Sequence, residues 1–396
     1  MNDLMAGAFS GSKEYRTGST PSPMHWLLPN EPRVVNFKAQ SGLTERHLLP
    51  ALADLEAFFL SLRAMVDPTL FQSKPIKLGK PYPIGQCLEI TRAVQQKLPI
   101  AAAALSDNAA ATRGYKAYSA FRKAGGTVRQ VWGDLRAEFF QNAFQVGTLY
   151  VDVANDTVTP TKPKVEILPF AEANLVPIAD FRHFTSLATT YWQARIYPNH
   201  VLPELAPTLP LIHVMPNGNI QIAEATQYMV ALSQAKAFNA SEEVLRDELM
   251  PTDVFTRIIT RLGGTRWKLA QTPEQGRQAA LYACREQRAK KWHLSRQRAN
   301  NSIKAALELN KHLVNAFPSD KPQPTQTIRI NQFEYDVATL PDSARHHVMN
   351  LQVTDQAITH LKQQLAIYQT ARTAYARALF EALPEQTVPD DDISDV

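Results

Sequence analysis

One stretch of about 75 residues, Pro83–Asp156, limits the possible fold more than any other part of the chain. It opens with Pro-Ile-Gly-Gln and then Cys87, which begins an amphipathic segment that ends at Pro99. A glycine turn that leads into this periodicity predicts a helix with the cysteine in its first turn. Three later segments alternate apolar and polar side chains and are predicted strands: 127–132, 137–146 and 148–153.

A cysteine in the first turn of a helix is a candidate nucleophile. The helix N-terminus favours the thiolate, which is the reactive form of the side chain. Such a cysteine also needs a general base within hydrogen-bond reach and a third group that orients the base. The alternative interpretation is that Cys87 is a small hydrophobic residue of the core, which is the common role of a free cysteine.

The order of glycines and polar residues after Cys87 is similar to that of a known superfamily. Residues 125–133 read Gly-Gly-Thr-Val-Arg-Gln-Val-Trp-Gly, and Asn-Ala-Phe follows at 142–144, then Gly147 and Tyr-Val-Asp at 150–152. Over about 75 residues this resembles the catalytic half of a transglutaminase-like (papain-like) domain. The resemblance implies an α+β fold for residues 41–170, in which the cysteine helix packs against the strands that contain Arg129, Asn142 and Asp152.

The same resemblance assigns the candidate site. Cys87 takes the place of the nucleophile, Asn142 stands where the family has histidine, and Asp152 stands near the family's aspartate. The spacing from the glycine to this aspartate is about one residue short, so Asp156 competes for the third position. The remaining candidates are assigned to ligand binding: Gln86, Gln141, Arg129 and Trp132.

The asparagine departs from the family pattern in a way that bears on activity. Neither an asparagine nor a glutamine can accept and return a proton at neutral pH. A catalytic interpretation therefore needs a histidine from elsewhere, and His183, His200 and His213 are the downstream candidates. We expect a non-catalytic protein whose degenerate cleft binds a peptide or protein segment. The alternative is a cysteine-dependent hydrolase or acyltransferase that acts on amide or thioester bonds.

The segments before and after this domain are predicted from periodicity and proline. Residues 1–40 are expected to form an extended arm, and a helix should follow from about Leu43 and end before Pro68. Residues 171–317 are expected to be mixed but mostly helical, with a hairpin around Asn217-Gly218.

The end of this region carries the strongest charge asymmetry. Thr272-Pro273-Glu274 is a typical helix start, and no proline follows until Pro318, which predicts one long helix with at most one kink. From Arg257 to Lys311 there are 13 Lys and Arg against three Glu. This segment favours a nucleic-acid-binding or phage-related assembly protein as a further alternative, or it is a solvated helix face. The packed side of the helix should hold Leu281, Cys284, Trp292, Ala299, Ile303, Leu307 and Leu313.

The C-terminal residues predict a separate small module. Residues 326–383 indicate a strand pair followed by a helical hairpin whose last helix carries a heptad seam, which could serve homo-oligomerisation. Over about 55 residues this module resembles a small uncharacterised domain of phages and cyanobacteria, a resemblance that implies no known activity. Residues 384–396 are expected to be an acidic, mobile tail.

Composition and motifs exclude several classes of function. Two cysteines among 396 residues cannot form a disulfide framework, and we find neither a signal peptide nor the roughly 20 apolar residues of a membrane span. We therefore expect a cytoplasmic protein without a membrane partner. No phosphate-binding or dinucleotide motif is present, and the spacings of the histidines match no metal-ligand motif. We expect no cofactor and no metal.

Overall fold

The computed structural model describes most of the chain, in two units that are treated separately. Contacts group Met1–Gln323 into one compact unit and Pro324–Val396 into a second. The described ranges are 27–77, 80–104, 108–222, 227–314, 327–330 and 333–336, with single positions between 340 and 351.

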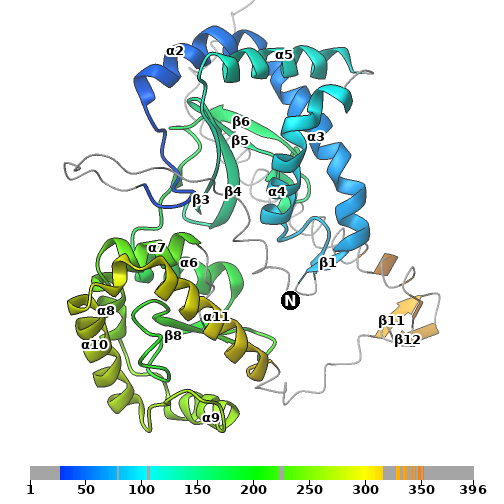
Figure 1. Cartoon of the computed structure of the whole chain (residues 1–396). Coiled ribbons are helices and arrows are strands. Elements are labelled where there is room, and N and C mark those ends of the chain that lie inside the picture. The colour runs from blue at the N-terminus through cyan, green and yellow to red at the C-terminus, as the bar shows by residue number, and fades with distance from the viewer. Residues whose placement is uncertain are drawn as a thin grey trace, which may run out of the picture. The chain divides into compact units, whose positions relative to one another are not determined.

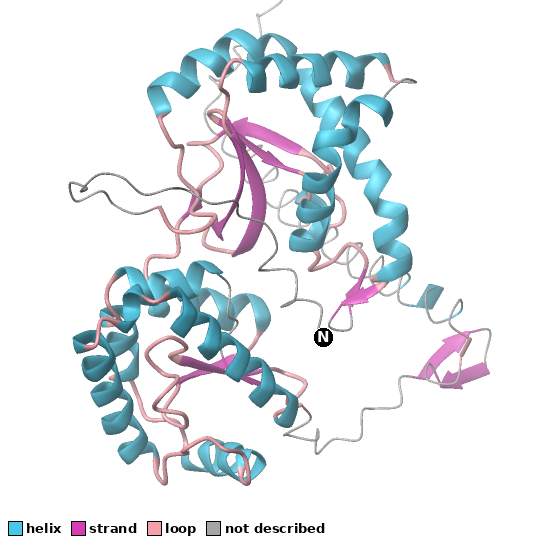
Figure 2. Cartoon of the chain, in the orientation of Figure 1, coloured by secondary structure: helices cyan, strands magenta, loops and turns pink. Residues whose placement is uncertain are grey.

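A five-stranded antiparallel sheet in the order β6-β5-β4-β3-β7 forms the centre of the first part of the large unit. The three strands predicted after the cysteine helix are all present, and each pairs with its neighbour in sequence. The presence of this sheet together with many helices confirms the α+β class (Figure 2). The strands are β3 (Val128–Leu135), β4 (Phe139–Val146), β5 (Leu149–Asp152), β6 (Glu166–Pro169) and β7 (Leu175–Val176).

Helices cover one face of this sheet (Figure 1). Their apolar side chains, among them Phe59, Ile90 and Phe121, pack with Phe144 and Val151 of the strands into one buried core. Every second residue of a strand points to the same face, so the even-numbered residues of β4 point to the face that the helices cover. The helices are α2 (Phe37–His47), α3 (Leu52–Ser73), α4 (Cys87–Lys97) and α5 (Ala109–Lys123).

The second part of the large unit is mostly helical, as predicted, and surrounds a three-stranded sheet. Its order is β10-β9-β8, and the hairpin expected around Asn217-Gly218 joins β9 to β10. The strands are β8 (Arg195–Pro198), β9 (Leu211–Val214) and β10 (Ile220–Ile222). The helices are α6 (Phe181–Trp192), α7 (Gln227–Ala235), α8 (Asn239–Leu245), α9 (Thr252–Leu262), α10 (Pro273–Ala289) and α11 (Arg296–His312).

The predicted first helix is wrong in its interior and at its C-terminal end. Pro50 lies in a short 3-10 turn that separates α2 from α3, so the helical stretch is broken where one helix was expected. At the C-terminal end α3 continues through Pro68 to Ser73. The turn beyond the proline is held from outside the helix, because Asp67 accepts a hydrogen bond from the Tyr82 hydroxyl and Phe71 packs against the same ring. Tertiary contacts thus override the local effect of the proline.

The predicted long helix is also wrong, because it is two helices. Thr272 caps the first of them as expected, since its side chain accepts a hydrogen bond from the backbone N–H of Gln275 at 3.2 Å. The helix stops at Ala289, Lys291 adopts a left-handed conformation with φ 56°, and Ser295 then caps α11. The reason is packing: Cys284 of α10 lies in one core cluster and Ile303 of α11 lies in another.

The predicted packed side of these helices is nevertheless correct. Cys284, Ala299, Ile303 and Leu313 are buried, and Leu281, Trp292 and Leu307 are half-buried against the same cores.

The extended arm is shorter than predicted. Helix α2 already begins at Phe37, and the residues before it are tied to the sheet, because the backbone N–H of Trp132 donates to the carbonyl of Asn30 at 2.7 Å. Residues 1–26 lie outside the described residues.

The predicted strand pair of the small unit is present as β11 (Thr327–Ile330) and β12 (Phe333–Asp336), which pair antiparallel. The helical hairpin and the acidic tail lie outside the described residues, apart from single positions before residue 352. Among the helices of the described ranges, none has the length and apolar character that crossing a membrane requires.

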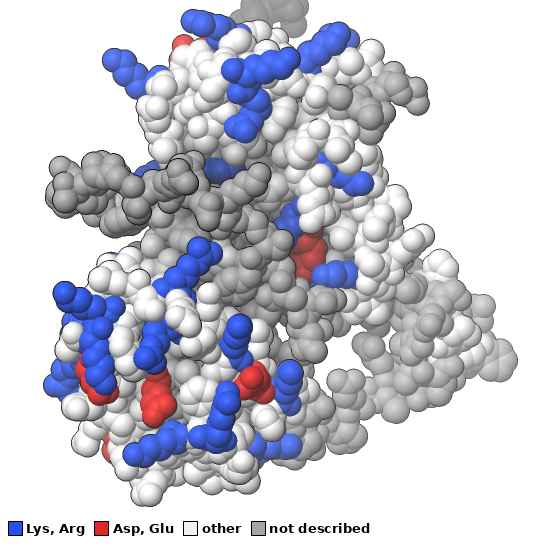
Figure 3. All heavy atoms as spheres, viewed as in Figure 1, with Lys and Arg blue, Asp and Glu red and all other residues white. Residues whose placement is uncertain are grey.

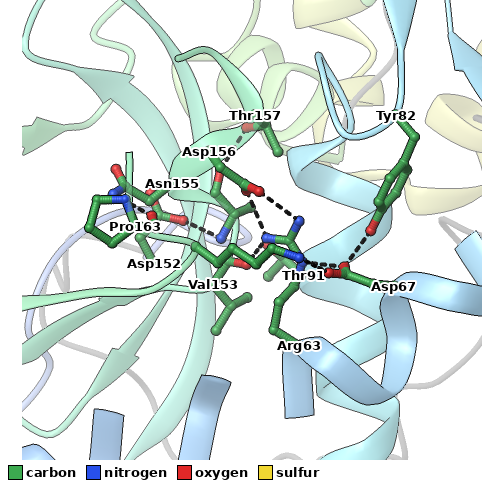
Figure 4. Close-up of polar contacts among 12 residues, drawn as sticks. Arg63, Asp67, Tyr82, Thr91, Asp152, Val153, Asn155, Asp156, Thr157 and Pro163 are labelled. Atoms are coloured by element: carbon green, nitrogen blue, oxygen red, sulfur yellow. Dashed lines mark hydrogen bonds and ion pairs between the residues drawn. The ribbon is translucent and has the colours of Figure 1, made fainter. Parts of the chain in front are cut away.

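A buried ion cluster joins α3 to the segment after β5 (Figure 4). The Arg63 side chain has no exposed surface, and its Nη1 donates to the carbonyl of Val153 at 2.7 Å and to Asp156 Oδ1 at 2.8 Å. Its Nη2 donates to Asp156 Oδ2 at 3.1 Å, which makes the pair bidentate, while its Nε donates to Asp67. Because Arg63 and Asp156 are buried, removing the guanidinium would leave the Asp156 carboxylate without an ion-pair partner in a medium of low polarity.

We expect Arg63→Met to lower the free energy of unfolding by about 3–5 kcal/mol, because Asp156 would stay buried without its partner. The measurement is urea unfolding followed by circular dichroism. The matched control is Arg113→Met, which removes an ion pair with Asp54 at the surface and should change stability little. Equal midpoints for the two variants would contradict a stabilising role for the buried cluster.

Candidate functional site

Cys87 and Asn142 lie in contact, as the sequence predicts. The backbone turns at Gln86, the N-cap residue of α4, so that Cys87 is the first residue of the helix. The Asn142 side-chain amide, from the middle of β4, donates through Nδ2 to the Cys87 sulfur at 3.5 Å. The Thr91 hydroxyl donates to the backbone carbonyl of Asn142 at 3.1 Å and fixes the helix on this strand.

A glutamine holds the asparagine in place. The Gln130 side chain, on the neighbouring strand β3, donates through Nε2 to Asn142 Oδ1 at 2.8 Å. The asparagine oxygen is therefore occupied by Gln130, and its amide N–H groups are the ones directed to Cys87. Gln130 is a site residue that the family pattern did not single out. The signal that could have found it is its place two residues before Trp132, on the same face of the strand.

Asp152 does not take the orienting position, so this prediction is wrong. Its carboxylate accepts hydrogen bonds from Gln141 Nε2, from the Tyr150 hydroxyl at 2.9 Å and from the backbone N–H of Ala154 at 2.7 Å. Phe144 pairs with Val151, and this register continues to place Val153, not Asp152, opposite Asn142. In this chain the spacing from Gly147 to Asp152 is about one residue shorter than in the family. A shift of one residue along a strand places the side chain on the other face of the sheet. Asp156, the competing candidate, binds Arg63 instead.

The surroundings of Cys87 favour the neutral thiol. Burial raises the pKa of Cys87 above its ordinary value. The hydrogen bond from Asn142 and the nearby Lys77 ammonium lower it, but their effect is smaller than that of burial. The Lys77 ammonium is itself paired with Glu89 at 3.0 Å and donates to the carbonyl of Gly85 at 2.8 Å. The reactive thiolate is therefore a minor species at neutral pH.

Each of the three downstream histidines contacts residues other than Cys87. His183 pairs with Asp134 at 2.8 Å through Nε2, and its Nδ1 accepts from the backbone N–H of Ala179. His200 bonds the carbonyl of Leu245, and His213 is buried beside Phe184, where burial lowers its pKa to about 4. Within the described ranges, the hydrogen-bond partner of the Cys87 thiol is an amide and not an imidazole. Nor does this part of the chain bring three potential metal-binding side chains together.

The residues predicted to bind a ligand are mainly structural. Arg129 donates to Gln145 and to the carbonyls of Glu31 and Arg33, and burial lowers its pKa to about 10. The Gln141 side chain donates a hydrogen bond to Asp152 on the face of the sheet that points away from Cys87.

Two of the predicted residues lie close to the site. Trp132 pairs across the strands with Asn142 and stacks on Phe140, with ring centroids 5.3 Å apart. Gln86 is fully buried beside Cys87 and donates to the carbonyl of Lys74 at 2.9 Å.

The chain matches no family model, no curated protein and no solved structure in our comparisons. The resemblance to transglutaminase-like domains therefore stays a prediction from the sequence. The residue order of that prediction agrees with the contact between Cys87 at the start of a helix and Asn142 on the neighbouring strand. What departs from it is the side of the sheet that Asp152 occupies.

The Asp152 carboxyl should make stability depend on pH. Burial raises its pKa from 3.8 to about 6, so the folded state holds its proton more tightly than the unfolded state. Stability from this group is complete below about pH 4 and is lost as the pH rises through 6. The difference between the two pKa values corresponds to about 3 kcal/mol.

We expect this pH dependence between pH 4 and 7 in the wild type and its loss in Asp152→Asn, measured as the free energy of urea unfolding. Glu172→Gln, which changes an exposed carboxyl group, is the control and should keep the wild-type profile. Parallel profiles for wild type and Asp152→Asn would show that the carboxyl group does not titrate in this range.

Proposed function

We propose that this protein is a non-catalytic binding protein in which the Cys87–Asn142 site, a degenerate form of a transglutaminase-like arrangement, holds a peptide or protein segment. The observation that carries the proposal is the amide of Asn142 at 3.5 Å from the cysteine sulfur, in the position that a general base would need. A side-chain amide can donate and accept hydrogen bonds, but it cannot transfer a proton at neutral pH.

Acyl transfer at this site would lack two requirements. The attacking group would be a thiol whose pKa is raised by burial, so little thiolate is present. The leaving amine would also need a proton, and within the described residues the groups bound to Cys87 and Asn142 are amides, backbone carbonyls and a threonine hydroxyl. General acid–base help contributes roughly 10²–10⁴-fold to rate, so a site without it would be slow.

The groups at the site suit a polypeptide. The Asn142 oxygen already accepts from Gln130, and its amide donates to Cys87. A side-chain amide has two N–H groups and two lone pairs on its oxygen, so each of these amides keeps a further donor or acceptor of the kind that a peptide backbone pairs with. The first turn of α4 adds backbone N–H groups that have no partner inside the helix and that suit carbonyl oxygens. The rings of Trp132 and Phe140 lie on the same face of the sheet beside the polar groups, where both are buried in a core cluster with Phe184. Apolar side chains next to a few fixed polar groups are typical of ligand-binding sites.

The alternative, a cysteine-dependent hydrolase or acyltransferase, is favoured by one observation. Cys87 is only half-buried at the first position of α4, where the helix terminus and Lys77 both favour the thiolate. Thiol reactivity against pH separates the two proposals, since an enzyme of this kind needs a low pKa.

We expect Cys87 to react with iodoacetamide slowly at pH 6, with an inflection above the ordinary value of a free cysteine, about 8.5. Mass spectrometry of the Cys87 peptide measures the rate, and the buried Cys284, whose pKa is raised to about 12, is the internal reference. Asn142→His places an imidazole beside the sulfur and should lower the inflection. Fast alkylation of the wild type at pH 6 would favour the enzyme.

Peptides selected on the wild-type protein from a random peptide library should bind through this site. We expect alkylation of Cys87 to weaken their binding at least tenfold, because the added group would lie against Asn142. The matched control is the Cys87→Ser variant treated in the same way, in which the peptides should keep their affinity. Fluorescence anisotropy gives the dissociation constants. Equal binding before and after alkylation, or a library without any binder, would contradict the proposal.

A further inference from the structure

A run of cations on α11 and the turn before it lacks acidic partners. Five consecutive Lys and Arg side chains form no ion pair with any other residue in the described ranges: Lys291, Arg296, Arg298, Lys304 and Lys311. All five are exposed. Neighbouring cations differ in this respect, since Arg288 pairs with Glu242 and Arg266 pairs with Glu308. The run therefore carries a positive field that the neighbouring described residues leave uncompensated.

Three of these cations are arranged along one face of a single helix. Arg296, Asn300 and Lys304 follow one another at steps of four residues, and Lys311 comes seven residues later, which places all of them on one side of α11. From Arg296 to Lys311 the helix rises about 22 Å. Figure 3 shows Lys and Arg side chains spread over the face on which α11 lies in Figure 1, with fewer Asp and Glu among them.

A tryptophan holds Arg298 of this run and the neighbouring Lys290 at the start of α11. The Arg298 guanidinium lies 3.8 Å from the centroid of the Trp292 ring, and the Lys290 ammonium lies 5.0 Å from it. Trp292 itself packs against the core that contains Cys284, so the ring is anchored from beneath. The cation–π contact fixes the Arg298 side chain without neutralising its charge, whereas Lys290 is also paired with Glu286 at 2.6 Å. The left-handed turn at Lys291 thus presents an ordered basic corner at the N-terminal end of α11.

We propose that the α11 face, defined by Arg296, Asn300, Lys304 and Lys311, binds the phosphate backbone of a nucleic acid without reading its sequence. Phosphates follow one another along a strand every 3.4 Å of axis, so a row of about 22 Å spans several of them. The amide of Asn300 lies between the cations and can donate to phosphate oxygens, as asparagine does in nucleic-acid interfaces.

The other anionic surfaces fit this face less well. A membrane surface is bound by an amphipathic helix that inserts its apolar side, but the apolar side of α11, with Ile303, Ala306 and Leu309, is buried in the core. An acidic protein segment would be attracted by the same cations. The chain itself contains such a segment near its C-terminus, with Asp390, Asp391, Asp392 and Asp395. The length and regular spacing of the row favour a polymer with a charge at every unit.

The test uses the full chain and fluorescein-labelled oligonucleotides of mixed sequence, 20 nucleotides long, single-stranded and double-stranded. Fluorescence anisotropy between 50 and 200 mM KCl gives the affinity and its salt dependence. We expect binding to either form, and we expect the triple variant Arg296→Gln, Lys304→Gln, Lys311→Gln to bind at least tenfold more weakly. The slope of log K against log salt should fall by about 2–3, since each phosphate contact contributes about 0.7–0.9.

The matched control removes the same charge elsewhere. Lys38, Lys116 and Lys123 are exposed on α2 and α5, and changing all three to glutamine should leave affinity and slope near the wild-type values. An equal loss in both triple variants would mean that net charge alone drives binding and would overturn the proposal. The absence of oligonucleotide binding would also overturn the proposal. The same samples are tested with a synthetic peptide of residues 385–396 and with vesicles that contain phosphatidylserine, and binding of either one in place of the oligonucleotides would overturn it as well. Circular dichroism checks that both variants keep the fold.

Discussion

The buried guanidinium of Arg63 is the interaction on which the arrangement around Cys87 depends. It connects α3 to the segment after β5 through Asp156 and the carbonyl of Val153. The same cluster reaches the loop that leads into α4, because Asp67 also accepts from Tyr82, and the backbone N–H of Gly85 donates to the carbonyl of Thr157 at 2.8 Å. A charge without exposed surface tolerates few geometries, since each unpaired group would cost several kcal/mol. The start of α4 is therefore held against the sheet by electrostatics as well as by packing.

The site is placed where two helical layers meet on one face of the sheet. Phe144 of β4 packs under Phe59 of α3, and Phe140 packs against Phe184 of α6, with ring centroids 5.1 Å apart. Asn142 lies between these two aromatic positions on the strand and has the same orientation. Its polar side chain is satisfied on both sides, by Gln130 and by the cysteine sulfur. A pair of amides thus occupies a position where the rest of the face is apolar.

The two proposed surfaces use different physical principles. The site at Cys87 offers a few fixed hydrogen-bonding groups beside aromatic rings, so its binding would depend on shape and on paired donors and acceptors. The α11 face offers unneutralised charge at the surface, so its binding would weaken with salt. Cys87 packs against the core that covers the five-stranded sheet, whereas α11 packs into the core around the three-stranded sheet. Substitutions at one site should therefore leave the other intact.

The sequence by itself determined the features that a few neighbouring residues encode. Alternation predicted β3, β4 and β5, the Gly-Gln turn predicted a helix at Cys87, and Thr272-Pro273 predicted the start of α10. It also determined the contact between Cys87 and Asn142, through the order of residues that resembles a known superfamily. Only the tertiary structure decided which face Asp152 occupies, whether α3 continues past Pro68, and where the long helix breaks at Lys291. These depend on strand register and on packing between segments far apart in the chain, and a one-residue change in register moves a side chain to the opposite face.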